Sequence, residues 1–325
     1  MINQQPSEKQ FSLSHSKDNP VIQLPERLTV LEAVAFKEIF DKLLQSDFGG
    51  KRIILDCSKT KFIDSSGIGA LVSNYKVAQK QEVELILELV QPAVMAVLSM
   101  TGLIDVLQID SSEKWSQSEQ PETHPSVRSW LKRAIDVVGA LVGLFITAII
   151  FIPVAIAIKL DSPGAIFFSQ TRCGWMGKKF KIWKFRSMCS DAEALKKKVE
   201  NQANGAFFKN DNDFRITRVG SFLRKTSLDE FPQFWNVLKG EMSLVGTRPP
   251  TQEEVDCYQV PEWQRLNVKP GMTGEWQVNG RSQVRNFEDV INLDLRYQKN
   301  WSFQYDLLLI FKTITVIFNK NSGAV

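Results

Sequence analysis

Two adjacent carboxylates, Asp229 and Glu230, are the residues of this sequence best suited to chemistry. They stand at the predicted start of a helix, and Arg248 follows in a short loop between a glycine and two prolines. Further cations lie just upstream, namely Arg215, Arg218, Arg224 and Lys225. Carboxylates among fixed cations suit a reaction on an anionic substrate that carries phosphate. A structural interpretation stands beside this one, because residues 227–230 also fit the capping box that begins many helices.

Acidic and basic side chains must carry any catalysis, because the chain has only two histidines. His15 and His124 lie in polar segments, which argues against histidine acid–base catalysis, a Ser-His-Asp triad and a histidine-ligated zinc site. A carboxylate can instead attack phosphorus and form an acyl phosphate, which divides a two-substrate transfer into two steps. A Mg²⁺ ion, held by one carboxylate and the phosphates of the substrate, would relieve the repulsion between adjacent acids.

The charge of the chain is divided unequally between its halves. Residues 1–126 contain 12 Lys and Arg against 17 Asp and Glu, whereas residues 127–325 contain 28 against 19. This asymmetry predicts two modules with different partners, and the basic one suits anionic lipid, nucleotide or nucleic acid. The four cysteines are scattered along the chain, which indicates reduced thiols in the cytoplasm rather than a disulfide framework.

The first half has the pattern of a compact α/β domain over residues 19–109. Residues 1–18 are polar and without periodicity, which predicts a disordered tail, and they lack the apolar core of a signal peptide. Residues 110–126 are rich in polar residues and proline, which predicts a linker. Within the domain we expect strands over 21–24, 52–56 and 83–90 and helices over 34–44, 66–79 and 92–98.

The turn over residues 62–69 joins a strand to a helix, with Asp64 or Ser65 as the predicted N-cap. Together with residues 99–103, this turn resembles the STAS family, the domains of sulfate transporters and anti-sigma-factor antagonists. The resemblance implies a mixed sheet with helices, and it implies that Ser65 is a regulatory site phosphorylated by a partner kinase. A phosphate there would lie at a helix N-terminus, which favours negative charge. The alternative is that Ser65 only caps the helix.

A long apolar run opens the second half. Residues 137–158 carry no charged side chain, and a helix of this length can span a bilayer. Pro153 lies inside the run, where it breaks or kinks a helix, and basic residues flank both ends, so both ends prefer the cytoplasmic side. We therefore expect a re-entrant helix–break–helix over residues 134–159 that enters one leaflet of the inner membrane from its cytoplasmic face. A single spanning helix is the alternative.

The remaining pattern predicts a mixed α+β domain rich in helices and associated with the membrane. Residues 165–168 and 179–186 are expected to be strands, and residues 287–299 an amphipathic helix. Residues 303–318 are apolar but short for a span, so they suit the membrane interface. Residues 189–214 are polar and rich in lysine, which predicts a solvated helix and loop.

Residues 127–320 resemble the bacterial sugar transferase family, the monotopic polyprenyl-phosphate phosphoglycosyl transferases. Several long motifs stand in the order of the family, namely the break at Pro153 and the stretches 133–136, 180–188, 227–240, 242–246, 269–274 and 277–281. The resemblance implies transfer of a sugar phosphate from a UDP-sugar to undecaprenyl phosphate with release of UMP. Such a reaction is the first membrane step in the synthesis of a surface glycan or exopolysaccharide.

The resemblance also implies roles for individual residues. Asp229 would attack the phosphate that bears the sugar and hold a covalent phosphosugar, while Glu230 would hold Mg²⁺ or assist proton transfer. Three cations match basic positions of the family and would bind phosphates: Lys184, Arg186 and Arg248. Asp294 and Asp306 match acidic positions of the family. Charge, more than motif, adds three substrate-binding candidates: Arg218, Arg224 and Arg281.

Three features depart from the family pattern. Thr247 replaces the first proline of a Pro-Arg-Pro loop and would loosen the segment that carries Arg248. Ile152 stands where relatives often have serine, and residues 275–276 replace a more usual Trp-Ala pair. The departures motivate an alternative, a membrane-tethered STAS regulatory protein with a degenerate transferase half. A nucleic-acid partner is not expected, because the basic residues interleave with apolar runs, and the sequence names neither the sugar nor the state of homo-oligomerisation.

Overall fold

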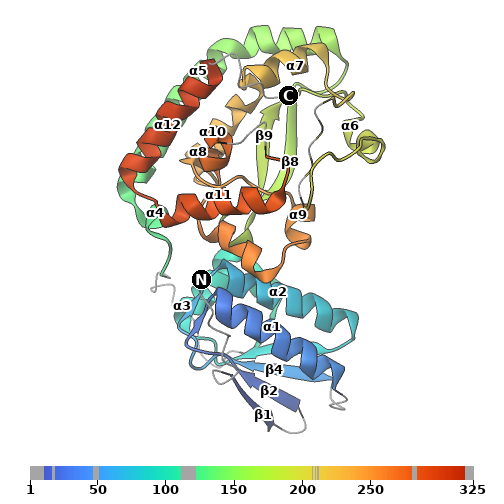
Figure 1. Ribbon diagram of the computed structural model, residues 1–325, viewed down its shortest axis with the longest axis vertical. Helices are drawn as coiled ribbons and strands as arrows, with labels where there is room; N and C mark the ends of the chain where they lie inside the picture. Colours follow the sequence, from blue (N-terminus) through green and yellow to red (C-terminus); the bar gives the residue numbers. More distant parts are fainter. Residues whose placement is uncertain are drawn as a thin grey trace. The chain divides into compact units, whose positions relative to one another are not determined.

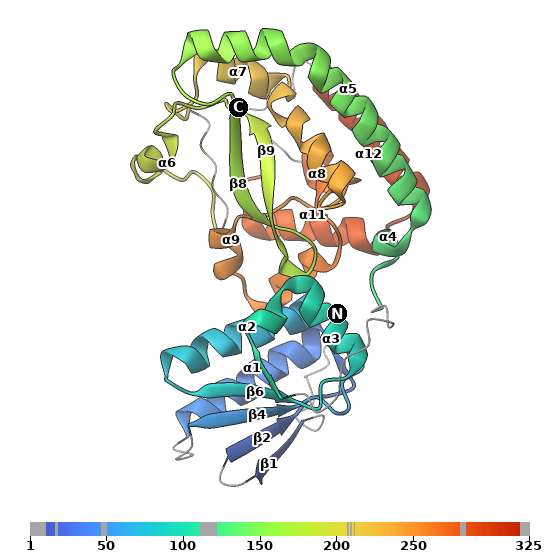
Figure 2. The same ribbon diagram turned by 180° about the vertical axis from the view of Figure 1, so that it is seen from behind.

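The computed structural model describes residues 11–16, 19–46, 51–110, 122–206, 208, 210, 212–279 and 284–318. Contacts within the chain divide it into two compact units, which are drawn in Figure 1 and, from behind, in Figure 2. The first unit contains residues 1–124 together with two short segments that are distant in sequence, 176–178 and 258–267. The second unit contains residues 125–175, 179–257 and 268–325.

A five-stranded mixed sheet forms the centre of the first unit. The strands follow the order β1-β2-β4-β6-β7, and β1 is antiparallel to β2 while the other neighbours are parallel. A separate parallel pair joins β3 to β5. The bounds are β1 (Ser12–Ser16), β2 (Asn19–Gln23), β3 (Arg27–Leu28), β4 (Arg52–Asp56), β5 (Phe62–Ile63), β6 (Glu84–Glu88) and β7 (Gln108–Asp110).

Strand β1 differs from the sequence-based expectation, which placed residues 12–16 in a disordered tail. All five residues of β1 are exposed, and each pairs with a residue of β2. The strand is therefore held by the backbone ladder rather than by buried side chains. A strand that buries no apolar side chain leaves no alternating pattern in the sequence, so periodicity could not detect it.

Helices cover the sheet of the first unit. α1 (Val30–Gln45) and α2 (Ser65–Lys80) lie side by side on one face of the sheet (Figures 1 and 2), and α3 (Pro92–Thr101) is followed by the 3₁₀ helix η2 (Leu103–Asp105). Gly102 ends α3 in the left-handed conformation, with φ of 76°. The strands and helices predicted between residues 21 and 98 are confirmed, with shifts of a few residues at their ends.

The N-terminus of α2 is capped by Asp64, the first of the two predicted candidates. Its carboxylate accepts hydrogen bonds from the backbone amides of Ser66 and Gly67 at 2.9 and 3.0 Å. The 3₁₀ helix η6 (Val260–Asn267) packs on α2 within the same unit, and the indole of Trp263 lies directly over Gly69. A Cβ atom at position 69 would lie 2.5 Å from Trp263 Cγ, so this contact requires glycine.

The second unit combines two small sheets with many helices. β8 (Phe167–Cys173) and β9 (Lys179–Phe185) form an antiparallel hairpin around η3 (Trp175–Gly177), and β10 (Ser243–Val245) is parallel to β11 (Gly271–Thr273). The helices are α4 (Pro125–Arg128), α5 (Trp130–Asp161), α6 (Ala192–Leu195), η4 (Lys196–Lys198), α7 (Arg218–Lys225), η5 (Leu228–Gln233), α8 (Phe234–Lys239), α9 (Gln252–Asp256), α10 (Glu275–Asn279), α11 (Phe287–Lys299) and α12 (Phe303–Phe318).

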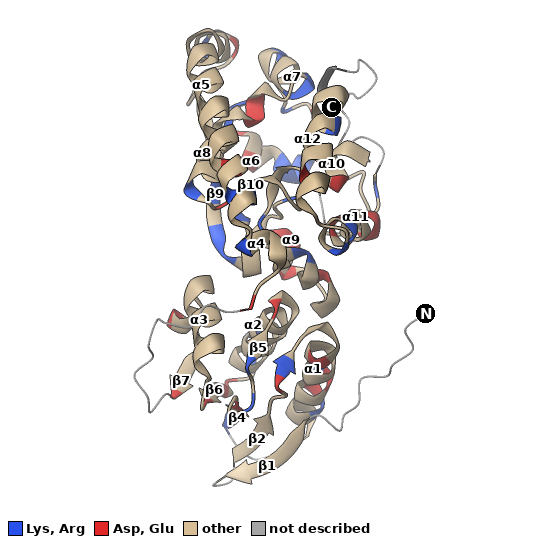
Figure 3. Cartoon of the chain, turned by 90° about the vertical axis from the view of Figure 1, so that its left-hand side faces the viewer, with Lys and Arg blue, Asp and Glu red and all other residues tan. Residues whose placement is uncertain are grey.

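Helix α5 contains the apolar run and is continuous over 32 residues. The chain stays helical through Pro153, and the helix bends along its length (Figures 1 and 2). The expected helix–break–helix is thus a single bent helix, because an internal proline removes one backbone hydrogen bond and can kink a helix without ending it. Its length and composition would allow it to cross a membrane, and only 22% of its most apolar window is buried. Figure 3 shows long stretches of α5 in the colour of uncharged residues.

Polar contacts tie the first turns of α5 to the rest of the second unit. Arg133 donates to the carbonyls of Val237 and Leu238 at the end of α8, both at 2.7 Å. Asp136 accepts hydrogen bonds at 2.9 and 2.8 Å from the first two residues of β10. Further along α5, Gly143 lies against the ring of Phe234, and a Cβ atom there would lie 2.3 Å from the ring. Glycine therefore sets how closely α5 approaches α8.

We expect Gly143→Ala to destabilise the protein by about 1–3 kcal/mol, because the added methyl group overlaps Phe234 and the backbones must separate. The measurement is thermal unfolding of the full chain in detergent. Val142→Ala is the matched control, since Val142 is one residue away on the same helix and 55% exposed. Equal melting temperatures for Gly143→Ala and wild type would contradict the close packing of α5 on α8.

Candidate active site

A large open groove in the second unit gathers most of the predicted site residues. Its volume of about 1440 Å³ is larger than the 300–1,000 Å³ of common small-molecule pockets. Strands β8 and β9, helix α7, the turn η5 and the loop before α9 contribute to it. Charged residues that line it include Arg172, Lys184, Arg186, Arg215, Arg224, Lys225, Asp229, Glu230, Arg248 and Glu254.

The turn η5 positions the two carboxylates. Leu228 and Phe231 flank Asp229 and Glu230 and pack on the apolar cluster that joins α5, β9 and α7. Residues three apart fall on one face of a 3₁₀ helix, so this pair anchors the turn while the acids between them point elsewhere. Ser227 enters the turn in the left-handed conformation, with φ of 56°, and its side chain makes no capping hydrogen bond. The capping-box interpretation of residues 227–230 is therefore wrong.

Glu230 is paired with Lys184 across the groove wall. Lys184 Nζ lies 2.8 Å from Glu230 Oε1, and each side chain is 26% exposed. The contact joins β9 to η5. Asn236, which is fully buried in α8, joins that helix to β9 as well, by donating to the carbonyl of Lys181 at 2.7 Å and accepting from the amide of Trp183 at 3.2 Å. Sequence reasoning passed over Asn236, although a polar residue within an apolar motif is a sign of such a bond.

Asp229 is 5% exposed and interacts electrostatically with Arg224. Burial lowers the pKa of the Arg224 guanidinium, and the negative charge of Asp229 is the largest effect that opposes the shift. Arg224 Nε donates to the hydroxyl of Ser187 at 3.0 Å, which fixes the guanidinium at the end of β9. An arginine that interacts electrostatically with Asp229 can neutralise charge on that carboxylate or on a phosphate beside it.

Arg186 lines the groove but directs its donors elsewhere. Its two terminal nitrogens donate to the carbonyls of Pro163 and Ser162 at 2.5 and 2.6 Å, just after the end of α5. Gly164, with φ of 122°, lets the backbone come this close to the guanidinium. Arg186 therefore caps the C-terminus of α5, where a cation is also favoured by the helix dipole.

Arg248 also lines the groove, and it forms a two-fold ion pair with Glu254 at 2.7 and 3.0 Å. Its guanidinium lies 5.7 Å from the centre of the Trp276 ring. Arg172 of β8 is a further cation beside it and donates to the carbonyl of Pro249 at 2.9 Å. Sequence reasoning did not select Arg172 or Glu254. The signal for Glu254 was its position three residues after Thr251, the spacing of a capping box, which the structure contains.

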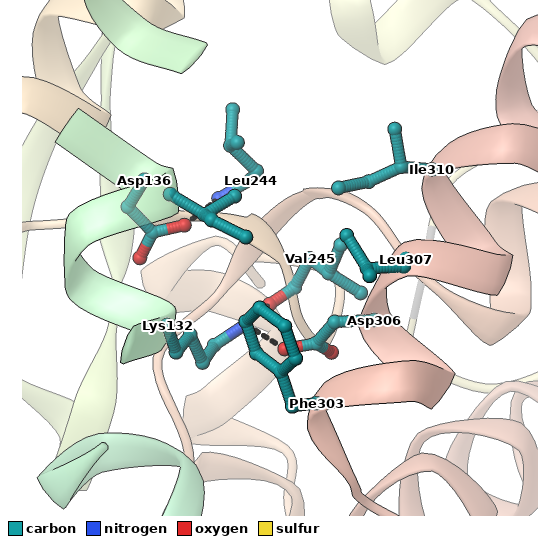
Figure 4. Close-up of a pocket in the computed structure, with 9 residues that line it drawn as sticks. Lys132, Asp136, Leu244, Val245, Phe303, Asp306, Leu307 and Ile310 are labelled. Carbon is teal, nitrogen blue, oxygen red and sulfur yellow. Dashed lines mark hydrogen bonds and ion pairs between the residues drawn. The ribbon is translucent and has the colours of Figure 1, made fainter. Parts of the chain in front are cut away.

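Asp306 of α12 lies in a separate buried cluster between α5 and α12 (Figure 4). Its carboxylate lies 2.7 Å from Lys132 Nζ and accepts hydrogen bonds from Tyr297 at 2.8 Å and Trp301 at 3.1 Å. Lys132 also donates to the carbonyl of Val245 at 2.9 Å. The interaction joins α5, α12 and β10, and it satisfies both buried charges.

Two of the remaining predicted residues, Arg218 and Asp294, do not come together with the carboxylates. Arg218 is exposed at the start of α7 and Asp294 is buried in α11, and within the described part of the chain neither borders the groove. Arg281 lies outside the described residues. Ser65, in the first unit, is fully buried, with its hydroxyl 2.6 Å from both the carbonyl of Trp263 and the side-chain oxygen of Asn267.

The oxygen atoms that line the groove determine whether it can bind Mg²⁺. Among the described residues, no group of three or more His, Cys, Asp or Glu side chains is arranged to hold a metal ion. Mg²⁺ is commonly bound by only one or two carboxylates together with substrate phosphates, and it prefers oxygen donors. The carboxylates of Asp229 and Glu230 both line the groove and fit a Mg²⁺ ion that arrives with a phosphate-bearing ligand.

Fold and groove together define an α/β module joined to a helix-rich unit with one long apolar helix and a groove lined by acidic and basic side chains. Comparison with known families gives this class a name. Residues 127–320 match the model of the family "Bacterial sugar transferase", and because this match covers more than half of the sequence, the chain belongs to that family. Residues 10–115 match the STAS domain, so the mixed sheet with its helices is a STAS-like fold.

Named relatives resemble more than half of the chain. The galactosyl transferase CpsE of Streptococcus agalactiae serotype III (strain NEM316) is 48% identical over 188 residues, which cover 57% of this chain and 42% of the relative. The UDP-galactose-lipid carrier transferase of Erwinia amylovora is 43% identical over 203 residues, which cover 60% and 42%. The chain thus spans less than half the length of these two relatives. The exopolysaccharide production protein ExoY of Rhizobium meliloti (strain 1021) is 35% identical over 206 residues, 61% of this chain and 91% of the relative.

Among solved structures, the anti-sigma factor antagonist SpoIIAA in its unphosphorylated form is 25% identical. The alignment covers 31% of this chain and 89% of that one, with a TM-score of 0.26.

The buried pair of Lys132 and Asp306 gives a test of its structural role. We expect Asp306→Leu to destabilise the protein by about 3–5 kcal/mol, because it leaves the Lys132 cation buried without its carboxylate. Adding Lys132→Met should restore most of the loss, since the double variant contains neither charge of the pair. Thermal unfolding of both variants in detergent measures the difference. If the double variant were less stable than Asp306→Leu alone, the unpaired charge would not be the cause.

Proposed function

We propose that the protein transfers a sugar-1-phosphate from a UDP-sugar to a polyprenyl phosphate such as undecaprenyl phosphate, with release of UMP. One observation carries the proposal: Asp229 and Glu230 share a groove with Lys184, Arg224 and Arg248 in the unit that contains the long apolar helix. The carboxylates supply a nucleophile, the cations suit a diphosphate, and the apolar helix suits a substrate dissolved in the membrane. The product would begin a surface glycan or exopolysaccharide.

The names of further relatives support the same reaction class. A relative in Escherichia coli (strain K12), 43% identical over 195 residues, is a UDP-glucose:undecaprenyl-phosphate glucose-1-phosphate transferase. Another, in Salmonella typhimurium (strain LT2), 42% identical over 200 residues, is an undecaprenyl-phosphate galactose phosphotransferase. The relatives differ in their sugar, so the names support the nucleotide and the lipid acceptor and leave the sugar undecided.

The reaction proceeds in two displacements at one phosphorus. First, an oxygen of the Asp229 carboxylate attacks the phosphorus that bears the sugar. The bond from that phosphorus to the bridging oxygen of the diphosphate breaks, and UMP leaves with that oxygen. Second, a phosphate oxygen of the polyprenyl phosphate attacks the same phosphorus. The acyl phosphate bond then breaks, which restores the carboxylate and yields a polyprenyl diphosphate sugar.

The surrounding cations would stabilise the negative charge on the phosphoryl oxygens in both steps. Arg224 acts beside Asp229, and Lys184 beside Glu230, so both can stabilise the phosphoryl oxygens as the bonds exchange. Arg248 binds a phosphate further along the groove. Asp229 and Glu230 would hold Mg²⁺ together with the substrate phosphates, where the ion supplies charge neutralisation on the diphosphate. Glu230 would act as a metal ligand or a proton acceptor, and its ion pair with Lys184 holds its carboxylate in position.

We place the reaction at the cytoplasmic face of the inner membrane, with α5 entering one leaflet and returning. The bend of α5 and its exposed apolar surface support this arrangement, and so do the basic residues that flank both ends of the apolar run. Both carboxylates and their cations are in place in the groove, which favours an active transferase over a degenerate half that serves only as an anchor.

Ser65 is the proposed regulatory residue of the STAS-like domain. Its hydroxyl is buried against Trp263 and Asn267, so a kinase could reach it only after η6 leaves α2. A phosphate would not fit in that contact, and η6 would stay displaced. Phosphorylation at Ser65, or a protein partner that competes for the same surface, would therefore act by releasing η6.

We expect Asp229→Asn to lower UMP release by roughly a thousandfold or more, because the amide cannot form the acyl phosphate. The assay uses detergent-solubilised full chain, undecaprenyl phosphate and a panel of UDP-sugars. A sugar that supports turnover should also leave a radiolabelled phosphosugar on the wild-type protein when the lipid is omitted, and none on the variant. Full turnover by Asp229→Asn would refute the covalent route.

We expect chelation of divalent cations with EDTA to lower UMP release by at least about a hundredfold, and Mg²⁺ to restore it, because two adjacent carboxylates and a diphosphate repel one another without a cation. Unchanged thermal unfolding in EDTA would show that the loss is not structural. Turnover that persists in EDTA would mean that the cationic side chains alone neutralise the substrate.

A further inference from the structure

We propose that Glu254 and Arg172 are positioning residues that hold Arg248 in its place in the groove. The inference rests on the proposed function, in which Arg248 binds a substrate phosphate. The loop that carries Arg248 lacks the first proline of the family pattern, since Thr247 stands there. Sequence alone predicts a loosened loop, whereas the contacts around it are tight.

Three backbone carbonyls of the loop are held by neighbouring strands. The carbonyl of Thr247 accepts a hydrogen bond at 2.9 Å from the first residue of β11. Pro249 and Pro250 have no N–H group, so a carbonyl is the only backbone group through which each can be held. Arg172 donates to the carbonyl of Pro249 at 2.9 Å, and the amide of Cys173 donates to that of Pro250 at 2.9 Å. These bonds replace the stiffness that a proline at position 247 would give.

The side chain of Arg248 is held separately by Glu254. Two parallel hydrogen bonds, at 2.7 and 3.0 Å, match the planar guanidinium to the carboxylate and fix its orientation. Glu254 is itself fixed, because it belongs to the capping box of α9. Its backbone amide donates to the hydroxyl of Thr251 at 3.1 Å, and its carboxylate accepts from the amide of Thr251 at 3.3 Å. Glu254 therefore cannot move away without disturbing the start of α9.

Charge explains why two arginines accompany one carboxylate. Paired with Glu254 alone, Arg248 would have little net charge left for a phosphate. Burial lowers the pKa of Arg172 to about 10, with Arg248 as the next cause and Glu254 as the main opposing charge, so Arg172 is still protonated at neutral pH. The trio of Arg172, Arg248 and Glu254 thus has one net positive charge and can orient a guanidinium while still attracting an anion.

A double-mutant cycle tests whether Glu254 acts through Arg248. We expect Glu254→Gln to lower kcat/KM for UMP release about tenfold or more in the wild-type background, because the guanidinium of Arg248 loses the carboxylate that holds it with two hydrogen bonds. In an Arg248→Lys background, where the two-fold ion pair is already absent, Glu254→Gln should lower kcat/KM by less than about twofold. Equal losses in both backgrounds would overturn the proposal.

Two matched controls separate positioning from structure. Glu253→Gln makes the same change one residue earlier, on a side chain that is 75% exposed and pairs with Lys196, and should change kcat/KM by less than about twofold. Thr251→Val removes the hydroxyl that caps α9 but leaves the ion pair between Glu254 and Arg248, so it should lower the melting temperature and reduce kcat/KM clearly less than Glu254→Gln does. A loss of kcat/KM in Thr251→Val as large as in Glu254→Gln would mean that Glu254 acts only through the start of α9.

Two variants test Arg172, one conservative and one that removes its charge. Arg172→Lys keeps the charge and one donor for the carbonyl of Pro249, whereas Arg172→Met removes both. We expect KM for the UDP-sugar to rise several-fold in Arg172→Lys and about tenfold or more in Arg172→Met. Identical kinetics of Arg172→Met and wild type would exclude a role for Arg172.

A binding measurement distinguishes failure of this inference from failure of the proposed reaction. Calorimetric titration of the full chain with UMP needs no turnover. If no UDP-sugar supports UMP release but UMP binding weakens in Glu254→Gln and not in Glu253→Gln, the positioning role stands without the reaction. If UMP release is normal and neither UMP affinity nor kcat/KM changes in Glu254→Gln, the reaction stands and the positioning role is wrong.

Discussion

Two neighbouring negative charges share one turn of the chain, and Asp229 is almost fully removed from water. Burying a charge costs several kcal/mol unless an opposite charge or hydrogen bonds compensate for it. Lys184 of β9 and Arg224 of α7 supply that compensation, so the strand, the helix and the turn η5 must meet at one place. The apolar residues on either side of the carboxylates make this meeting favourable, because they bury their side chains in the cluster that joins the same elements.

The helix that suits the membrane is built into the same framework. Arg133 and Asp136 bind it to α8 and β10 near its start, and Arg186 caps its end. Lys132 adds a buried ion pair with Asp306. Basic and acidic side chains that resemble substrate ligands in the sequence thus hold α5 against the unit that contains the groove. Anchoring a long apolar helix at both ends keeps the groove in a defined relation to the lipid that the helix would enter.

The first unit contributes a different kind of constraint. The α2 terminus that carries Ser65 is occupied by η6, a segment far away in sequence, and the contact depends on a glycine at position 69. A hydroxyl in such a contact can act as a switch only if the segment over it can leave. The proposed regulation through Ser65 would therefore be linked to the stability of the first unit, because a modification there would release η6 at the expense of buried packing.

Local patterns in the sequence were enough to predict the carboxylate pair, the α/β character of the first half, and helix α11 with its ends. These features depend on residue types and on spacing over a few residues. Partners could not be predicted in the same way. Arginine looks alike in a sequence whether a carboxylate holds it beside the proposed phosphate site, as Glu254 holds Arg248, or whether it caps the end of a helix, as Arg186 does. Only the tertiary structure brings distant segments together, and that decided which charges remain available to a substrate.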